Sequence, residues 1–160
     1  ISSGLVGSEM CIRDSRMEKG FITHAEIDGR ATAYDVGLQK MISEKKDFIG
    51  NKMAQRPGLL DPNRERLVGL KTNSPQSSVT AGSHLFNIDD EPLADNNQGY
   101  ISSAAFSPIE NCYIGLAFLK RGPERWGEKI KAVNFVADTE LNCEICPPVF
   151  YDPEGGKPRA

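Results

Sequence analysis

The sequence lacks the features that mark several classes of protein. No apolar run approaches the ~20 residues that a membrane-spanning helix needs, so we expect no membrane partner. The 19 Lys and Arg are interspersed with 22 Asp and Glu, for a formal net charge of -3. Because no basic stripe is present to neutralise phosphates, no nucleic-acid partner is expected. Four cysteines in 160 residues do not suggest a disulfide framework, and a reducing, cytoplasmic location is expected.

Nucleotide and metal motifs are also missing. The 15 glycines form no G-x-G-x-x-G or Walker pattern. The C-x-x-C from Cys143 to Cys146 has no second cysteine pair, and the two histidines, His24 and His84, stand alone. In a strand, residues three apart point to opposite faces, so the two sulfurs would diverge. We interpret the cysteines as small apolar side chains and predict no metal site.

The first fifteen residues have no hydrophobic period that suits a helix or a strand. From Gly4 to Ser15 they resemble the translation of a transposase sequencing adapter, whose end encodes Glu9 to Asp14. We therefore expect residues 1–15 to be an adapter artefact, with the true N-terminus of the reading frame lost upstream. The alternative is a genuine N-terminal arm.

Residues 16–60 mix short elements. Gly20–Ile27 alternates apolar and polar side chains loosely, as a strand would, and Tyr34–Ile42 suits a short helix or a helix-to-strand passage. Asp47 is the expected N-cap of a helix over Phe48–Gln55, which Arg56–Gly58 would end. This pattern predicts an α+β segment.

Strand-like runs then follow one another, separated by turn residues. They are Arg66–Thr72, Ser83–Ile88, Gly99–Phe106, Cys112–Arg121, Glu128–Phe135 and Glu140–Cys146. Six short strands at even spacing predict a mainly antiparallel six-stranded β-barrel. The predicted boundaries are 16–60 for the α+β segment, 61–152 for the barrel domain and 153–160 for a tail.

The fourth run has two apolar faces. Ile114, Leu116 and Phe118 share one face, and the other face is made of Tyr113, Ala117 and Leu119. One face can fill the barrel while the other packs against the preceding segment.

Glu18 is the first candidate for a binding residue. It lies in Arg16–Ile22, just before an apolar run. A carboxylate accepts a bidentate pair of hydrogen bonds from an amino-pyrimidine edge. From composition alone, however, a solvated surface glutamate is the simpler interpretation.

Three motifs resemble the late part of the glycine-cleavage T-protein (aminomethyltransferase) fold: Arg16–Ile22, Thr32–Leu38 and Lys45–Gly50. Leu67–Leu70 and the later barrel sequence are similar to the C-terminal barrel of that family. Pro148–Gly155 resembles the end of the α subunits of heterotetrameric sarcosine oxidases. The resemblance covers nearly all of the chain after residue 15.

The resemblance implies the site residues. The glutamate of the family's R-x-E-x-G motif holds the pterin ring and corresponds to Glu18. A basic residue before the D-F-I-G segment binds folate and corresponds to Lys46, or to Lys45 if the alignment shifts by one. A tyrosine near the C-terminus corresponds to Tyr151, although the local spacing differs. The family's catalytic aspartate lies upstream, so the chain itself holds no catalytic residue.

The resemblance also implies the activity of the parent enzyme. Sarcosine is oxidatively demethylated to glycine, and the one-carbon unit passes to tetrahydrofolate. FAD, FMN and NAD would be bound outside this chain, whose partners would be tetrahydrofolate and the other oxidase subunits. By itself the chain is expected to be inactive.

Two alternatives remain open. The chain could belong to a T-protein or a dimethylglycine dehydrogenase, or to a folate-binding protein with a structural or assembly role. Members of the last group typically carry a K-G-C-Y-x-G-Q-E motif, which does not occur in this sequence.

Overall fold

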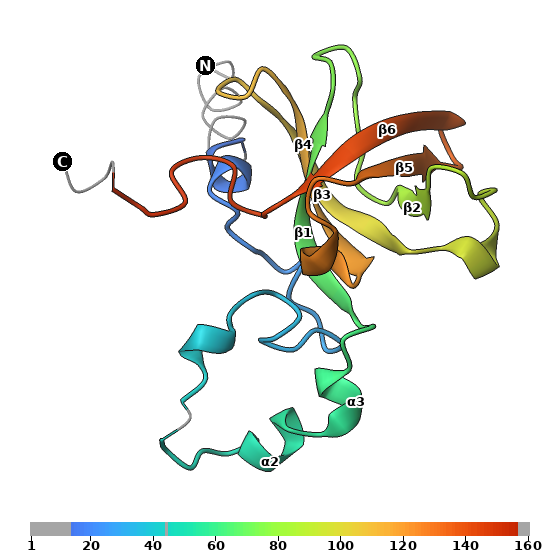
Figure 1. Cartoon of the computed structure of the whole chain (residues 1–160). Coiled ribbons are helices and arrows are strands. Elements are labelled where there is room, and N and C mark those ends of the chain that lie inside the picture. The colour runs from blue at the N-terminus through green and yellow to red at the C-terminus, as the bar shows by residue number, and fades with distance from the viewer. Residues whose placement is uncertain (1–13, 44, 157–160) are drawn as a thin grey trace, which may run out of the picture.

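The computed structural model of the chain describes residues 14–43 and 45–156. Its centre is a closed barrel with the strand order β1-β4-β3-β2-β5-β6 (Figure 1), in which all neighbouring strands are antiparallel. The strands are β1 (Glu65–Thr72), β2 (His84–Asn87), β3 (Gly99–Ser107), β4 (Cys112–Lys120), β5 (Lys129–Asn134) and β6 (Thr139–Cys146). The predicted fold class is therefore confirmed.

Strand β4 separates two hydrophobic clusters, as its two apolar faces predict. The inner cluster fills the barrel, and its β4 members are Tyr113, Ala117 and Leu119. The outer cluster takes Ile114, Leu116 and Phe118, and packs them against Met17 and Val36 from the preceding segment. Each fully buried aliphatic side chain contributes roughly 1.5–3 kcal/mol to the free energy of folding. The barrel wall is therefore a shared boundary between two cores.

Strand β3 contains a β-bulge. Its pairing with β4 shifts register between Ile101 and Ser103. Ile101 belongs to the inner cluster, whereas Ala105 belongs to the outer one. With strict alternation these two residues, four apart, would share a face, so the bulge exchanges the faces of the strand along its length.

The segment before the barrel departs from several expectations. Gly20–Ile27 forms turns rather than a strand, since the amides of Glu26 and Ile27 both donate to the carbonyl of Thr23. The expected helix over Tyr34–Ile42 is only a short 3-10 helix, η1 (Gln39–Met41).

The expected N-cap is wrong, whereas the expected helix end is correct to within one residue. Helix α2 (Asn51–Ala54) has Gly50 as its N-cap, at φ 96°, in place of Asp47, and it ends with Gln55 as its C-cap. Beyond that end Pro57 begins a second helix, α3 (Pro57–Leu60), because proline suits the first turn, where no amide donor is needed.

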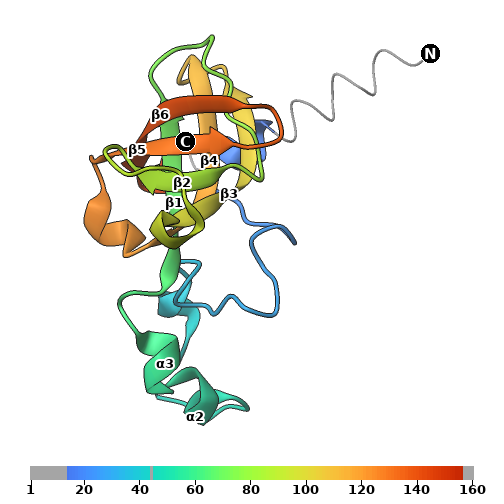
Figure 2. The ribbon, with the colours of Figure 1, turned by 90° about the vertical axis from the view of Figure 1, so that its right-hand side faces the viewer.

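Two parts of the segment that precedes the barrel lie at different places relative to it. The segment with η1, α2 and α3 extends away from one end of the barrel, whereas the short helical turn at residues 14–18 lies against the barrel wall (Figures 1 and 2). Of residues 1–15, expected to be an adapter artefact, 1–13 fall outside those described, and Asp14 and Ser15 lie in that helical turn. Within the described ranges, no helix is long and apolar enough to cross a bilayer.

Candidate functional site

The helical turn that carries Glu18 ends in a glycine with a left-handed backbone. The amide of Gly20 donates to the carbonyl of Met17, and the amide of Phe21 donates to that of Arg16. This pair of bonds is a Schellman motif, which favours glycine because φ at Gly20 is 65°. A Cβ atom at Gly20 would also lie 2.3 Å from the carbonyl oxygen of Pro148. The glycine thus lets the C-terminal tail approach the end of this turn.

The carboxylate of Glu18 is buried and is held through one oxygen. Glu18 is 7% exposed. Its Oε1 accepts hydrogen bonds from the hydroxyl of Ser107 at 2.6 Å and from the amide of Ile109 at 3.4 Å. Among the residues that the structure describes, no donor reaches Oε2. A carboxylate oriented in this way retains an acceptor for a ligand.

The C-terminal tail lies directly against Glu18. The amides of Phe150 and Tyr151 both donate to the backbone carbonyl of Glu18, each at 2.9 Å. Lys19 forms an ion pair with Asp152 at 2.7 Å, and its Nζ lies 5.5 Å from the centroid of the Tyr151 ring. The structure therefore brings together two of the predicted site residues, Glu18 and Tyr151, from nearly opposite ends of the sequence.

Lys45 and Lys46 lie elsewhere. Both are exposed, and they belong to the segment between η1 and α2, which extends away from the helical turn of Glu18 (Figures 1 and 2). The backbone amide of Lys46 donates to the hydroxyl of Ser43. The structure does not join these lysines to Glu18.

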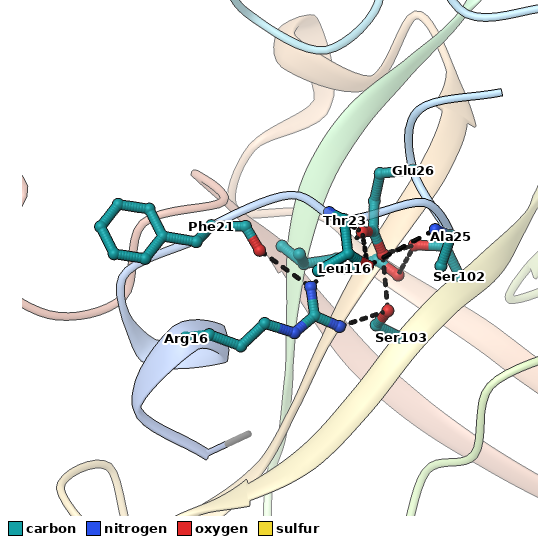
Figure 3. Close-up of polar contacts among 8 residues, drawn as sticks. All are labelled: Arg16, Phe21, Thr23, Ala25, Glu26, Ser102, Ser103 and Leu116. Atoms are coloured by element: carbon teal, nitrogen blue, oxygen red, sulfur yellow. Dashed lines mark hydrogen bonds and ion pairs between the residues drawn. The ribbon is translucent and has the colours of Figure 1, made fainter. Parts of the chain in front are cut away.

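A second buried carboxylate, Glu26, was not identified from the sequence. It is 1% exposed and lies beside the bulge of β3 (Figure 3). Its Oε1 accepts bonds from the hydroxyls of Ser102 and Ser103, at 2.8 and 2.5 Å. Its Oε2 accepts bonds from the amide and hydroxyl of Thr23, and pairs with the guanidinium of Arg16 at 3.4 Å.

The hydrogen bonds decide the charge of Glu26. Burial by itself raises the pKa of this carboxyl group, but the bonds from Ser103, Thr23 and Ser102 outweigh burial and hold the pKa below its ordinary value. Glu26 is therefore an ionised group inside the protein. In the sequence, only the consecutive Ser102 and Ser103 could have pointed to this site, and they indicate it only once the bulge is known to turn both hydroxyls toward Glu26.

A third buried carboxylate, Asp35, joins the N-terminal segment to the start of the barrel. It accepts two hydrogen bonds from the guanidinium of Arg64, at 3.1 and 2.7 Å. Both residues line an open cavity of about 360 Å³, together with Arg30 and Tyr100. The cavity contains charges of both signs, and its arginines are already paired with aspartates.

The cysteines of the C-x-x-C diverge as predicted. Cys143 is part of the inner cluster, whereas the sulfur of Cys146 lies on the outer side, next to Gly69. Burial raises the pKa of both thiols to about 12, so neither is activated as a nucleophile. The described residues contain no group of three or more side chains suited to a metal ion.

The fold and the site define a class of protein, in which a closed antiparallel barrel carries, on its outer wall, a preceding helical turn with a buried glutamate. The Glycine cleavage T-protein C-terminal barrel domain family matches residues 65–152, more than half of the chain, and the chain belongs to this family. The resemblance inferred from the sequence motifs is thereby confirmed.

Curated relatives include subunits of an oxidase. The chain is 39% identical over 140 residues to sarcosine oxidase subunit alpha of Rhizobium meliloti (strain 1021), which covers 87% of the chain and 14% of that subunit. It is 29% identical to the same subunit of Corynebacterium sp. (strain U-96), with 89% and 15% covered. The chain therefore spans about a seventh of these relatives.

Similarity extends to aminomethyltransferases. The chain is 28% identical to the aminomethyltransferase of Thermosipho melanesiensis, over 76% of the chain and 31% of that protein. The crystal structure of aminomethyltransferase T of the glycine cleavage system from Bartonella henselae shares the fold, with a TM-score of 0.72 at 20% identity. That match covers 88% of the chain and 38% of that structure.

Proposed function

We propose that this chain is the folate-binding C-terminal portion of a sarcosine oxidase α subunit. The observation that carries the proposal is the carboxylate of Glu18. It is buried and fixed through Oε1, and its second oxygen has no donor among the described residues. An amino-pyrimidine edge offers the N–H donors that such an oxygen accepts, and a charged acceptor makes the stronger kind of hydrogen bond.

Tyr151 and Lys46 take separate parts in this proposal. The tail carries Tyr151 to the turn of Glu18, where its ring can contact the pterin end of a folate. The exposed ammonium of Lys46, or of Lys45, would pair with a carboxylate of the folate tail. Because these lysines lie on the extended segment, they would meet the ligand at its far end.

The parent reaction follows from the relatives that share the longest similarity. An oxidase would convert sarcosine to glycine, and the one-carbon unit would pass to tetrahydrofolate held beside Glu18. The chain itself supplies binding and orientation, which accelerate a transfer by holding the reactants together. FAD, FMN and NAD would be bound outside the chain, whose partners would be other oxidase subunits in the cytoplasm.

A second candidate is a fragment of an aminomethyltransferase. The similarity to the Thermosipho melanesiensis protein supports it. Both candidates use the same site for a reduced folate, and they differ in the source of the one-carbon unit.

Calorimetric titration of the 160-residue chain with 5-formyltetrahydrofolate tests the folate site. Saturable binding is expected, and Glu18→Gln should weaken it about tenfold, the cost of losing one charge-assisted hydrogen bond. Absence of binding, or equal affinity in the variant, overturns the proposed role of Glu18.

A chimera separates the two candidates. The matching 140 residues of the Rhizobium meliloti sarcosine oxidase subunit alpha can be replaced by this chain. If the chain belongs to an oxidase of that type, the assembled chimera should oxidise sarcosine and deliver the one-carbon unit to tetrahydrofolate. Free formaldehyde in place of the folate product would contradict the assignment.

A further inference from the structure

Strand β3 binds both Glu26 and Glu18: Ser102 and Ser103 donate to Glu26, and Ser107 donates to Glu18. Arg16 and Glu18 belong to one helical turn, and both reach β3. The guanidinium of Arg16 donates a hydrogen bond to the hydroxyl of Ser103 at 2.8 Å, and the carboxylate of Glu18 accepts one from the hydroxyl of Ser107 at 2.6 Å. Between these two contacts, Met17 packs in the outer cluster with Ala105. The turn is thus held along β3 at three successive outward positions.

The β-bulge makes this arrangement possible. Ser103, Ala105 and Ser107 alternate with residues of the opposite face, so one shift of register aims all three outward. The bulge also lets the consecutive Ser102 and Ser103 donate to the same oxygen of Glu26, which a regular strand would prevent. A single backbone irregularity therefore serves both carboxylates.

Arg16 connects Glu26 to the helical turn that carries Glu18. Besides Glu26 and Ser103, its guanidinium donates to the carbonyl of Phe21 at 2.8 Å (Figure 3). The amide of Phe21 returns a bond to the carbonyl of Arg16. These bonds fix the end of the helical turn just two residues from Glu18.

We infer that Glu26, together with Arg16 and the bulge serines, is a positioning clamp that sets the orientation of Glu18 for its ligand. The inference rests on the proposed function, because it assumes that Glu18 holds a pterin. Glu26 is a positioning residue and contacts no ligand itself. Its charge, rather than its volume, is what matters, since the partly buried guanidinium of Arg16 and three hydroxyls are all oriented by it.

A double-mutant cycle on the 160-residue chain tests the clamp, with 5-formyltetrahydrofolate as the probe. Glu18→Gln and Glu26→Gln should each weaken binding about tenfold, a size typical of coupled residues in one network. The double variant should also be about tenfold weaker, rather than about a hundredfold, because an unoriented Glu18 and an absent Glu18 carboxylate have the same consequence.

The outcomes separate the clamp from the folate site. Unchanged affinity in Glu18→Gln overturns the proposed function and the clamp with it. Weakened binding in Glu18→Gln but not in Glu26→Gln overturns the clamp alone. A hundredfold loss in the double variant shows that Glu26 acts independently of Glu18, and that also overturns the clamp.

Two further variants protect the test from a folding defect. Ser103→Ala removes one donor to Glu26 while leaving every charge in place, and it should weaken binding about threefold in the wild-type background and have no effect in Glu18→Gln. Asp35→Asn breaks an equally buried carboxylate–arginine pair on another part of the chain. It should lower the unfolding temperature and leave folate affinity unchanged. If Asp35→Asn weakens binding as much as Glu26→Gln does, the effect is general destabilisation and the clamp is refuted.

Discussion

The barrel and the segment between residues 37 and 64 bury their side chains very differently. Every strand of the barrel contains buried residues, and the outer wall is covered by a second cluster. Helices η1, α2 and α3 bury none, and Ile49 and Met53 are 105% and 51% exposed. Helices of three or four residues are not stable by themselves in water, because forming the first turn is unfavourable.

The difference extends to the candidate site. Glu18 and Tyr151 are held by the barrel wall and the tail, whereas Lys46 lies on the segment with little buried surface. A site built on packed elements holds its geometry more narrowly than one built on loops. In the proposed folate site, the barrel side would therefore orient the ligand, and the segment would contribute charge.

The largest effect is expected from a core truncation. Leu119→Ala, at a residue with 0% exposure inside the barrel, should lower the free energy of unfolding by about 2–5 kcal/mol. Ile49→Ala on the segment should change it by less than about 0.5 kcal/mol. Urea unfolding followed by circular dichroism measures both. Comparable losses would show that the two regions share one core.

A glycine pair comes next. Gly20→Ala should cost about 3 kcal/mol, because φ is 65° and the new Cβ would clash with the Pro148 carbonyl. Gly37→Ala, at φ 77° but with no atom near its Cβ, should cost only about 1 kcal/mol. Thermal unfolding of both variants gives the comparison. Equal costs would mean that the tail does not pack against the turn of Glu18 in solution.

Acid tests the junction between the two regions. Burial raises the pKa of Asp35, but hydrogen bonds from Arg64 and Thr32 outweigh it, and the pKa lies below its usual range. A carboxyl group with a lowered folded-state pKa stabilises the protein above its unfolded-state pKa, and that contribution is lost as pH falls through the folded-state value.

The urea midpoint should therefore decline below about pH 4, near the pKa of an unfolded aspartate. The decline should be shallower in Asp35→Asn. Identical pH profiles of the variant and the wild type would show that Asp35 does not contribute to the loss of stability in acid.

The smallest effect on stability is expected from Lys46→Ala. An exposed lysine contributes less than about 0.5 kcal/mol to folding. Folate affinity should fall by about fivefold or less, as for a solvent-exposed ion pair, and less at high salt. Lys45→Ala is the matched control, and a larger loss in that variant would move the folate contact to Lys45.

The strands were predictable because their signal is local. Alternation and turn residues placed all six within two residues of their observed ends, and the two faces of β4 were assigned correctly. The start of α2 and the existence of α3 were not predicted, since short exposed helices carry little hydrophobic pattern. The predicted domain boundaries, and the roles of Glu18, Lys46, Lys45 and Tyr151, stay predictions.

The barrel, its two apolar faces and the family motif around Glu18 could be predicted from the sequence, because each depends on neighbouring residues. The contact of the tail with Glu18 and the burial of Glu26 could not, because they arise from tertiary contacts. Both depend on pairings between residues more than seventy positions apart: the tail amides bond to the carbonyl of Glu18, and the carboxylate of Glu26 is bound at a bulge that shifts β3 by one residue. Periodicity within a strand contains no information about such a shift, because the partner strand and the covering segment select it.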